Sequence, residues 1–246
     1  MLVRSLTAGA VEARETWALS HLKNRDPRFP QAWAVASGVP GWFKESVAAG
    51  MFVALAEISP KRIVEIGSYL GRSTVFFAKA MDTLGCDGEV VAIDPHTGDR
   101  QNKAKLGVEG DLSSLKLFRD HLAAVRVTDR VRPIVAGSDD AAVGWSDPID
   151  FLFVDGWHSY EAVYQDGTNW TPFVAGNGAI VFDDTGNYPE LARAVDDLAA
   201  AGVLAKWAQV AGQTWCGPPG SKRPSYMDFV VSCYRPVPRR HKAGVR

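Results

Sequence analysis

The chain has 246 residues, with 27 Lys and Arg against 28 Asp and Glu and a formal net charge of −1. This balance argues against a nucleic acid as partner, because such binders neutralise phosphates with a basic surface. The three cysteines are widely spaced and form no CxxC pair, so neither a disulfide framework nor a zinc site is indicated, and a soluble protein of the reducing cytoplasm is expected.

The N-terminal segment, residues 1–55, is predicted to be helical. Apolar residues recur at three- and four-residue spacing in residues 11–23 and 44–57, separated by a stretch with Pro and Gly. Residues 1–29 carry charges where a signal peptide is apolar, and no apolar run is long enough to span a bilayer, so no membrane partner is expected. We expect the segment to form a lid over a binding pocket or an oligomer contact.

From residue 62 onward, short β-branched runs alternate with helical patterns. Strands are expected at 62–66, 89–93, 131–135, 151–154 and 179–182, and helices at 72–82, 115–125, 160–167 and 190–201. Near-continuous apolar strands between helices are typical of an α/β fold with a parallel sheet covered on both faces. Two last strands, 205–213 and 227–234, are expected to pair antiparallel, because only a Gly- and Pro-rich loop separates them. Residues 56–235 would form this domain, and the basic tail, 236–246, is expected to be disordered.

The sequence IVEIGSYLGRST, residues 63–74, predicts a strand, a turn with two glycines and the start of a helix. Gly67 and Gly71 would let a ligand approach the backbone where the helix offers free N–H groups. Their spacing departs from the GxGxxG pattern of dinucleotide sites, and Glu65 suits an ammonium group better than a pyrophosphate. The pattern predicts a site for a nucleoside cofactor; a tight turn without a ligand is the alternative.

Two more polar segments follow the next expected strands. Asp94 ends the second strand, where its carboxylate would accept hydrogen bonds from both ribose hydroxyls; a turn residue before Pro95 is the alternative. Ser138 and Asp139 follow the third strand, where an adenine edge would lie. Both residues also suit a helix cap.

A group of carboxylates with a histidine follows the fourth and fifth expected strands. Asp155 ends FLFVD, and Asp183 and Asp184 end IVFDD, so all three would meet at one edge of a parallel sheet. Close carboxylates repel unless they are protonated or bound to a cation, and oxygen ligands without thiolates favour Mg²⁺ first and Mn²⁺ or Ca²⁺ next. His158 would reach the same point and accept a proton from a hydroxyl. The alternatives are helix capping by the Asp pair and a surface turn for the histidine.

The segments VEIGSYLGRST, VVAIDPHTGD, FLFVDGWHSYEAVYQD and GAIVFDDTGNYPELARAVDD together resemble the class I S-adenosylmethionine-dependent methyltransferases. Within that class they are similar to the metal-dependent O-methyltransferases related to the macrocin-type enzymes of macrolide sugars. The resemblance spans residues 41–235, and its most specific part is DGxHxYxxVxxD with a later DD. It implies a Rossmann-like seven-stranded sheet with a reversed last hairpin, and a homo-oligomer.

The resemblance also implies a role for each matching residue. The residues expected around the methionine part of S-adenosylmethionine are Glu65, Gly67, Ser68, Gly71 and Ser73. Asp94 would hold the ribose, and Ser138 and Asp139 would lie near the adenine. The metal ligands would be Asp155, Asp183 and Asp184, and either His158 or the metal-bound Asp155 would remove the proton.

The expected reaction transfers a methyl group to a hydroxyl of a sugar, in a glycosylated natural product or a bacterial oligo- or polysaccharide. Chelation of Mg²⁺ by two neighbouring substrate oxygens would lower the pKa of the attacking hydroxyl. Catechols also offer vicinal oxygens, so a phenolic acceptor is the alternative. Flat rings that could stack on a pyranose favour the sugar: Trp157, Tyr160, Trp170, Tyr188 and Trp215. Alternatives of another class are an NAD-dependent oxidoreductase, which the missing GxGxxG opposes, and a non-catalytic nucleoside-binding module.

Overall fold

One sheet of seven strands organises the part of the chain that the computed structural model describes, residues 8–97 and 114–234. The strands are β1 (Arg62–Ile66), β2 (Glu89–Ile93), β3 (Val131–Ile134), β4 (Ile149–Val154), β5 (Val174–Phe182), β6 (Ala205–Val210) and β7 (Gln213–Gly217). Their order in space is β3-β2-β1-β4-β5-β7-β6; β1 to β5 pair in parallel, and β7 is antiparallel to both of its neighbours. The predicted Rossmann-like, mostly parallel sheet is confirmed.

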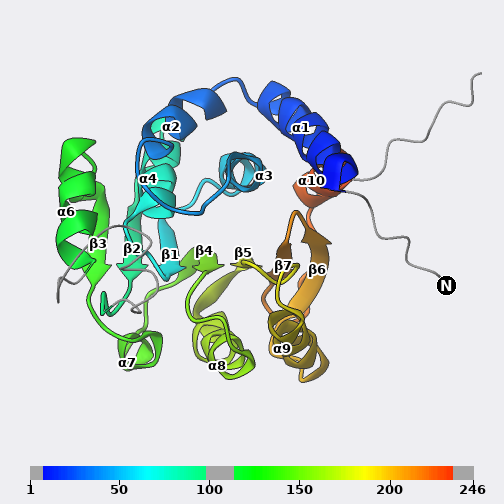
Figure 1. Ribbon diagram of the computed structural model, residues 1–246. Coiled ribbons are helices and arrows are strands. Elements are labelled where there is room, and N and C mark those ends of the chain that lie inside the picture. Colours follow the sequence, from blue (N-terminus) through cyan, green and yellow to red (C-terminus); the bar gives the residue numbers. More distant parts are fainter. Residues whose placement is uncertain (1–7, 98–113, 235–246) are drawn as a thin grey trace, which may run out of the picture.

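Helices cover both faces of this sheet (Figure 1). Above it in the figure lie α1 (Ala8–Arg25), α2 (Phe29–Ala36), α3 (Glu45–Ile58), α4 (Arg72–Leu84), α6 (Leu115–Ala124) and α10 (Ser225–Tyr234). Below it lie α7 (Ser138–Ala142), α8 (Tyr160–Trp170) and α9 (Pro189–Ala200). Two short 3-10 helices, η1 (Thr128–Arg130) and η2 (Thr171–Phe173), precede β3 and β5.

Each face of the sheet has its own hydrophobic core, because successive side chains of a strand point to opposite faces. In β4, Phe151 and Phe153 belong to the core shared with α3 and α4, whereas Leu152 and Val154 belong to the core shared with α8 and α9. All four side chains are buried. A strand covered on both faces therefore reads as a continuous apolar run, which is why its sequence predicted it.

The N-terminal helices form part of the upper layer. Helix α3 is buried over residues 46–55, α2 packs against α4, and α1 packs against α3 and α10. Helix α2 occupies the stretch that the sequence predicts as a break; Pro30 stands in its first turn, where no intrahelical N–H is lost. Whether residues 1–55 also cover a pocket or join copies in a homo-oligomer stays a prediction, as does the domain boundary at residue 56.

The antiparallel end of the sheet is a tight hairpin of β6 and β7. Ala211 and Gly212 connect the strands, and their φ angles are 54° and 88°. Two successive positive φ angles suit the right-handed twist of a two-residue hairpin. The prediction of a single strand over 205–213 was wrong, because β6 ends at Val210 and the turn follows directly. Only one glycine marks this turn in the sequence, so the turn was not recognised.

The second predicted strand of that pair, 227–234, is instead the body of α10. Met227, Val230 and Cys233 are buried at helical spacing, and the helix packs against α1 and α3. The prediction was wrong because a short apolar run with β-branched residues fits a buried helix as well as a strand.

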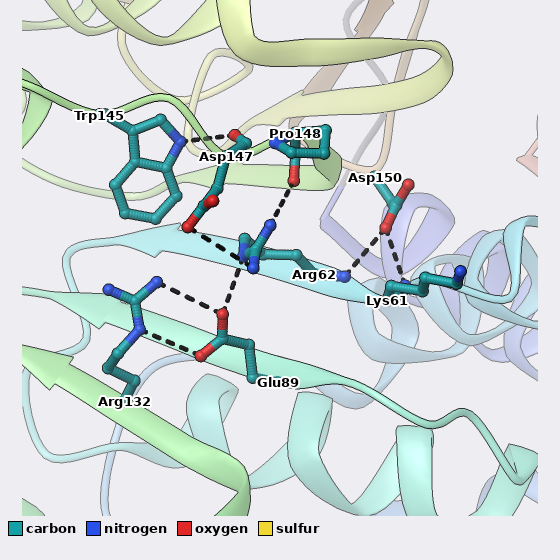
Figure 2. A network of polar contacts seen from close by, with 8 residues as sticks. All are labelled: Lys61, Arg62, Glu89, Arg132, Trp145, Asp147, Pro148 and Asp150. Carbon is teal, nitrogen blue, oxygen red and sulfur yellow. Dashed lines mark hydrogen bonds and ion pairs between the residues drawn. The ribbon is translucent and has the colours of Figure 1, made fainter.

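A polar network joins the amino ends of four neighbouring strands (Figure 2). Arg62 Nε donates to Glu89 Oε1 at 2.8 Å, and Arg132 Nε donates to Oε2 at 3.0 Å. Burial alone would raise the pKa of Glu89, but the hydrogen bonds from the two arginines outweigh it and lower that pKa. Asp150 accepts the backbone N–H groups of Lys61 at 2.8 Å and of Arg62 at 2.9 Å. These contacts fix β1, β2, β3 and β4 at the edge opposite to the predicted site.

No helix among the described residues has the length and apolar character to cross a membrane. The basic tail, 236–246, lies outside the described residues, so its disorder stays a prediction.

Candidate active site

The predicted site residues follow strands whose carboxyl ends lie level. Ile66 of β1 pairs in register with Ile93 of β2 and Val154 of β4, and Val154 pairs with Phe182 of β5. The residues directly after these four strands therefore meet at one edge, as in other open α/β sheets that bind ligands there.

The loop after β1 approaches the loop after β4 so closely that only glycine fits. Gly67 has a φ of 91°, and a Cβ atom there would lie 2.0 Å from the carbonyl oxygen of Asp155. Gly71 also has a φ of 91° and precedes α4, and a Cβ on it would lie 3.0 Å from a ring carbon of Phe118. Both predicted glycines are thus required by the backbone and its neighbours.

Glu65 is a fully buried carboxyl on the α4 side of the sheet. The Thr74 hydroxyl donates to its Oε2, and its Oε1 is buried without a well-formed hydrogen bond to the described residues. Burial raises the pKa of Glu65 to about 7, against the hydroxyls of Ser73 and Thr74, which lower it. Ser68 is likewise buried, and its Oγ has no hydrogen-bond partner among the described residues. These are orphaned polar atoms at the predicted methionine subsite, and Thr74 is a contact that the prediction missed.

Asp94 fixes two backbone segments at the predicted ribose subsite. Its Oδ2 accepts the N–H of Tyr69 at 2.8 Å, and its Oδ1 accepts the N–H of His96 at 2.7 Å. The carboxylate therefore ties the glycine loop after β1 to the end of β2. Each carboxylate oxygen has further lone pairs for ribose hydroxyls. Trp42, from the segment between α2 and α3, stacks on Tyr69 with ring centroids 5.3 Å apart.

Ser138 and Asp139 begin α7, where they contact α8. Asp139 Oδ1 accepts a hydrogen bond from Asn169 Nδ2 at 2.9 Å. Ser138 contacts Asp166, a buried carboxyl of α8 that the sequence interpretation left without a role. Burial raises the pKa of Asp166 to about 6, and the hydrogen bond from Ser138 opposes that rise.

The structure brings Asp155, His158 and Asp184 together. His158 Nε2 lies 3.8 Å from Asp155 Oδ1 and 3.5 Å from Asp184 Oδ2, and one ligand atom from each residue falls within 4.8 Å of the others. Burial, followed by the charge of Asp183, raises the pKa of Asp155 well above its usual range. The carboxylate of Asp155 in turn raises the pKa of His158. We name these three residues the acidic cluster.

Asp183 stands beside this cluster with one oxygen engaged elsewhere. Its Oδ1 accepts the backbone N–H of Asp184 at 2.8 Å and the side-chain amide of Gln213 at 2.9 Å. Asp184 has a φ of 54°, and its Oδ1 accepts from Asn187 Nδ2 at 2.6 Å. Gln213 and Asn187 are residues that sequence reasoning missed. No local pattern could indicate Gln213, because it reaches the site from β7 across a strand pairing.

Residues 64–185 match a family model described as a methyltransferase domain. The chain is similar to that domain over this stretch. The matched stretch runs from β1 to the residue after Asp184, so it contains both the glycine loop and the acidic cluster. This match supports the prediction that the protein is a methyltransferase, and it gives no support to the alternative of an NAD-dependent oxidoreductase.

The chain is 29% identical over 136 residues to the uncharacterized protein y4gI of Sinorhizobium fredii; the match covers 55% of this chain but only 14% of that protein. In structure it is similar to the S-adenosylhomocysteine-bound methyltransferase PaMTH1 of Podospora anserina, with a TM-score of 0.64 and 13% identity over 89% of this chain and 99% of that one. It is also similar to the O-methyltransferase TomG of Streptomyces achromogenes in complex with S-adenosylmethionine, with a TM-score of 0.55 and 17% identity over 79% of this chain and 91% of that one. At identities of 13% and 17%, these two similarities show a shared fold and nothing more.

Proposed function

We propose that this protein is a methyltransferase that transfers a methyl group from S-adenosylmethionine to a hydroxyl of a sugar, with Mg²⁺ held at the acidic cluster. The observation that carries the proposal is the meeting of Asp155, His158 and Asp184 directly beside the glycine loop, at the edge where ligands of such sheets bind. PaMTH1 and TomG, two proteins of similar fold, bind S-adenosylhomocysteine and S-adenosylmethionine.

The polar atoms around β1 fit S-adenosylmethionine. Buried carboxyl and hydroxyl oxygens without partners are costly unless a ligand satisfies them, and Glu65 Oε1 and Ser68 Oγ are such atoms. An ammonium group on the ligand would favour the ionised form of Glu65, which burial opposes. Asp94 offers the remaining lone pairs of its carboxylate to the ribose.

The donor set of the acidic cluster fits a hard divalent cation. Asp155 and Asp184 supply carboxylate oxygens with no thiolate among them, and Asp183 adds negative charge next to Asp155. Such a set favours Mg²⁺, with Mn²⁺ and Ca²⁺ as substitutes. A cation there would also relieve the mutual repulsion that, together with burial, raises the pKa of Asp155.

His158 is the proposed base. Bound S-adenosylmethionine supplies an electrophilic methyl group, and a bound divalent cation supplies positive charge that lowers the pKa of an acceptor hydroxyl. The Nε2 atom of His158 takes the proton of that hydroxyl. Tyr188 packs against the imidazole with ring centroids 4.9 Å apart, which limits its rotation. The carboxylates of Asp155 and Asp184 stabilise the imidazolium that results; Asp155 is the alternative base.

The aromatic residues next to the cluster support a ring-shaped acceptor. Trp157 is 68% exposed and Tyr188 39% exposed, so both offer free ring surface. Trp170 and Trp215, in contrast, are fully buried and serve packing. The ring of Tyr160 is stacked on Tyr164 with centroids 5.8 Å apart, and the guanidinium carbon of Arg193 lies 4.7 Å from its centroid. Two of the five rings considered for stacking thus remain next to the cluster, and Trp42 adds a third exposed ring beside the glycine loop.

The test is a methylation assay of the purified protein with S-adenosylmethionine and Mg²⁺. Products from a panel of glycosides, oligosaccharides and catechols would be analysed by mass spectrometry. We expect one added methyl group on a glycoside with vicinal hydroxyls, and loss of turnover in EDTA. Asp155→Asn and His158→Gln should abolish transfer, whereas the exposed Asp120→Asn serves as the control.

The outcomes separate the alternatives. Methylation of catechols but not of glycosides would assign a phenolic acceptor instead. Unchanged turnover in EDTA would contradict the metal. Calorimetric binding of NAD but not of S-adenosylmethionine would refute the proposal as a whole.

The three cysteines are free thiols, which supports a cytoplasmic site for the reaction.

A further inference from the structure

Gln213 is a buried amide that the proposed reaction does not use. It begins β7, is 2% exposed, and its Nε2 donates to Asp183 Oδ1 at 2.9 Å. The nitrogen of the amide must face this oxygen, because an ionised carboxylate only accepts hydrogen bonds. The same Oδ1 also accepts the backbone N–H of Asp184 at 2.8 Å. Two accepted hydrogen bonds occupy both lone pairs of an oxygen, so Oδ2 is the oxygen of Asp183 that stays available to a cation.

The register of the sheet shows to which side this Oδ2 turns. Strand β5 lies between β4 and β7, and both pairings continue to Phe182, the last residue of β5. The next positions on the three strands are Asp155, Asp183 and Gln213, which therefore form one row on the same face of the sheet. A carboxylate is planar, and its Oδ1 faces Gln213 on β7. The Oδ2 of Asp183 is therefore turned to the side of Asp155 and the acidic cluster.

The hairpin that carries Gln213 is tied to the loop that follows β5. The carbonyl oxygen of Gly212 accepts the N–H of Gly186 at 2.8 Å and the hydroxyl of Thr185 at 3.2 Å. A Cβ atom on Gly186 would lie 2.7 Å from the Cα of Gly212, so the two backbones touch. Gln209, on the other strand of the hairpin, donates to the carbonyl of Thr185 at 3.3 Å. The amide of Gln213 is thus fixed relative to this loop and cannot follow a rotating carboxylate.

We propose that Gln213 is a positioning residue for cation selectivity: it leaves Asp183 a single oxygen for the cation at the acidic cluster and thereby favours Mg²⁺ and Mn²⁺ over Ca²⁺. Mg²⁺ and Mn²⁺ suit octahedral sites, whereas Ca²⁺ takes about six to eight oxygens and readily binds both oxygens of one carboxylate. The inference rests on the proposed cation and adds the residue that selects it.

A purely structural role of Gln213 makes a different prediction. If its amide only joined β7 to the loop after β5, its loss would lower the stability and weaken the binding of all divalent cations alike. A positioning role changes the ratio between the affinities for Mn²⁺ and Ca²⁺, because a released carboxylate offers both of its oxygens. It does so only through Asp183.

The experiment is a double-mutant cycle in which electron paramagnetic resonance measures Mn²⁺ binding, and competition with Mn²⁺ measures Ca²⁺ binding. The proteins are the wild type, Gln213→Met, Asp183→Asn and the double variant. Gln209→Met is the matched control, because this glutamine lies on the same hairpin but its amide donates to a backbone carbonyl instead of a carboxylate.

For the wild type and the control we expect Mn²⁺ to bind at least about tenfold more tightly than Ca²⁺. In Gln213→Met the affinity for Mn²⁺ should fall about tenfold, as it does when other residues that orient a metal ligand are lost. The affinity for Ca²⁺ should fall about twofold or less, because Asp183 can then bind through both oxygens. The ratio of the two affinities should therefore fall at least about fivefold.

The double variant decides the mechanism. Its ratio should equal that of Asp183→Asn, because Gln213 acts through that carboxylate. If Gln213→Met keeps the wild-type ratio, or if it alters the ratio equally in the Asp183→Asn background, the positioning role is wrong while the proposed cation stands. Should Gln213→Met fail to fold, Gln213→Glu keeps the shape without the N–H donors, and an unchanged ratio there refutes the inference. If the wild type binds neither ion, the proposed metal site itself is wrong and the inference with it.

Discussion

The buried carboxyl of Glu65 makes the stability of the free protein depend on pH. In the unfolded chain this group has a pKa of 4.5, and burial in the folded protein raises the pKa to about 7. Between these values the folded protein holds a proton that the unfolded chain has released, so the free energy of unfolding falls as the pH rises. At about 1.4 kcal/mol for each pH unit, the loss attributable to Glu65 is about 3 kcal/mol by pH 8.

The replacement Glu65→Gln removes this titration. The free energy of unfolding of the variant minus that of the wild type should rise by about 3 kcal/mol between pH 4 and pH 8. Any cost of burying the amide is the same at both pH values and does not affect this change. Urea unfolding at a series of pH values measures the difference. The exposed Glu161→Gln on α8 is the control, and its difference from the wild type should stay nearly constant.

The same variant tests the role of Glu65 in the cofactor site. Binding of S-adenosylhomocysteine should strengthen in the wild type as the pH rises through 7, because its ammonium group prefers the ionised carboxyl. In Glu65→Gln the affinity should be at least about tenfold lower at pH 8, since a charge-assisted hydrogen bond is lost. A stability difference that is independent of pH would refute the raised pKa. A pH-dependent stability with unaltered ligand binding would refute only the contact with the ammonium group.

Three further predictions concern the backbone, the opposite edge and the metal. Gly67→Ala should destabilise the protein by about 3 kcal/mol or more in urea unfolding, because its Cβ would collide with Asp155, whereas Gly85→Ala, at a φ of 72° but in open space, should cost only about 1 kcal/mol. Asp150→Ala leaves two backbone N–H groups without their acceptor and should cost about 1–2 kcal/mol while the catalytic rate stays unchanged. Asp184→Ala should weaken Mn²⁺ binding, measured by electron paramagnetic resonance, at least about tenfold; an unchanged affinity would exclude Asp184 as a ligand.

The central strands were predictable because they are buried on both faces. The predicted bounds of β1 and β2 are those observed, β4 begins two residues before its predicted start, and a glycine or an acidic residue follows each of the three strands. The C-terminal part was less predictable, since residues 227–234 offer apolar and β-branched side chains that fit a helix or a strand equally. The packing of this segment against α1 and α3 favours the helix, and the local sequence does not show that packing.

The site was predictable where one motif carries several of its residues. Asp155 and His158 are three residues apart, and the turn after β4 alone brings them together. The partner of Asp183, Gln213, comes from β7 and depends on the pairing of that strand with β5, which no local pattern encodes. The sequence interpretation quoted Asp166 in its motif, but its burial and its contact with Ser138 emerge only from the packing of α7 on α8.

The contact between Gly67 and Asp155 links the proposed cofactor site to the proposed metal site. Because the Cα of Gly67 has no side chain, the carbonyl of Asp155 lies directly against the glycine loop, and the Asp155 N–H donates to Ile66 O at 2.8 Å. A shift of the loop that would hold the methionine part of the cofactor must therefore move the residue that would hold the cation. In-line methyl transfer requires donor and acceptor to be placed within fractions of an ångström. A rigid junction between the ends of β1 and β4 meets that requirement without a separate positioning element.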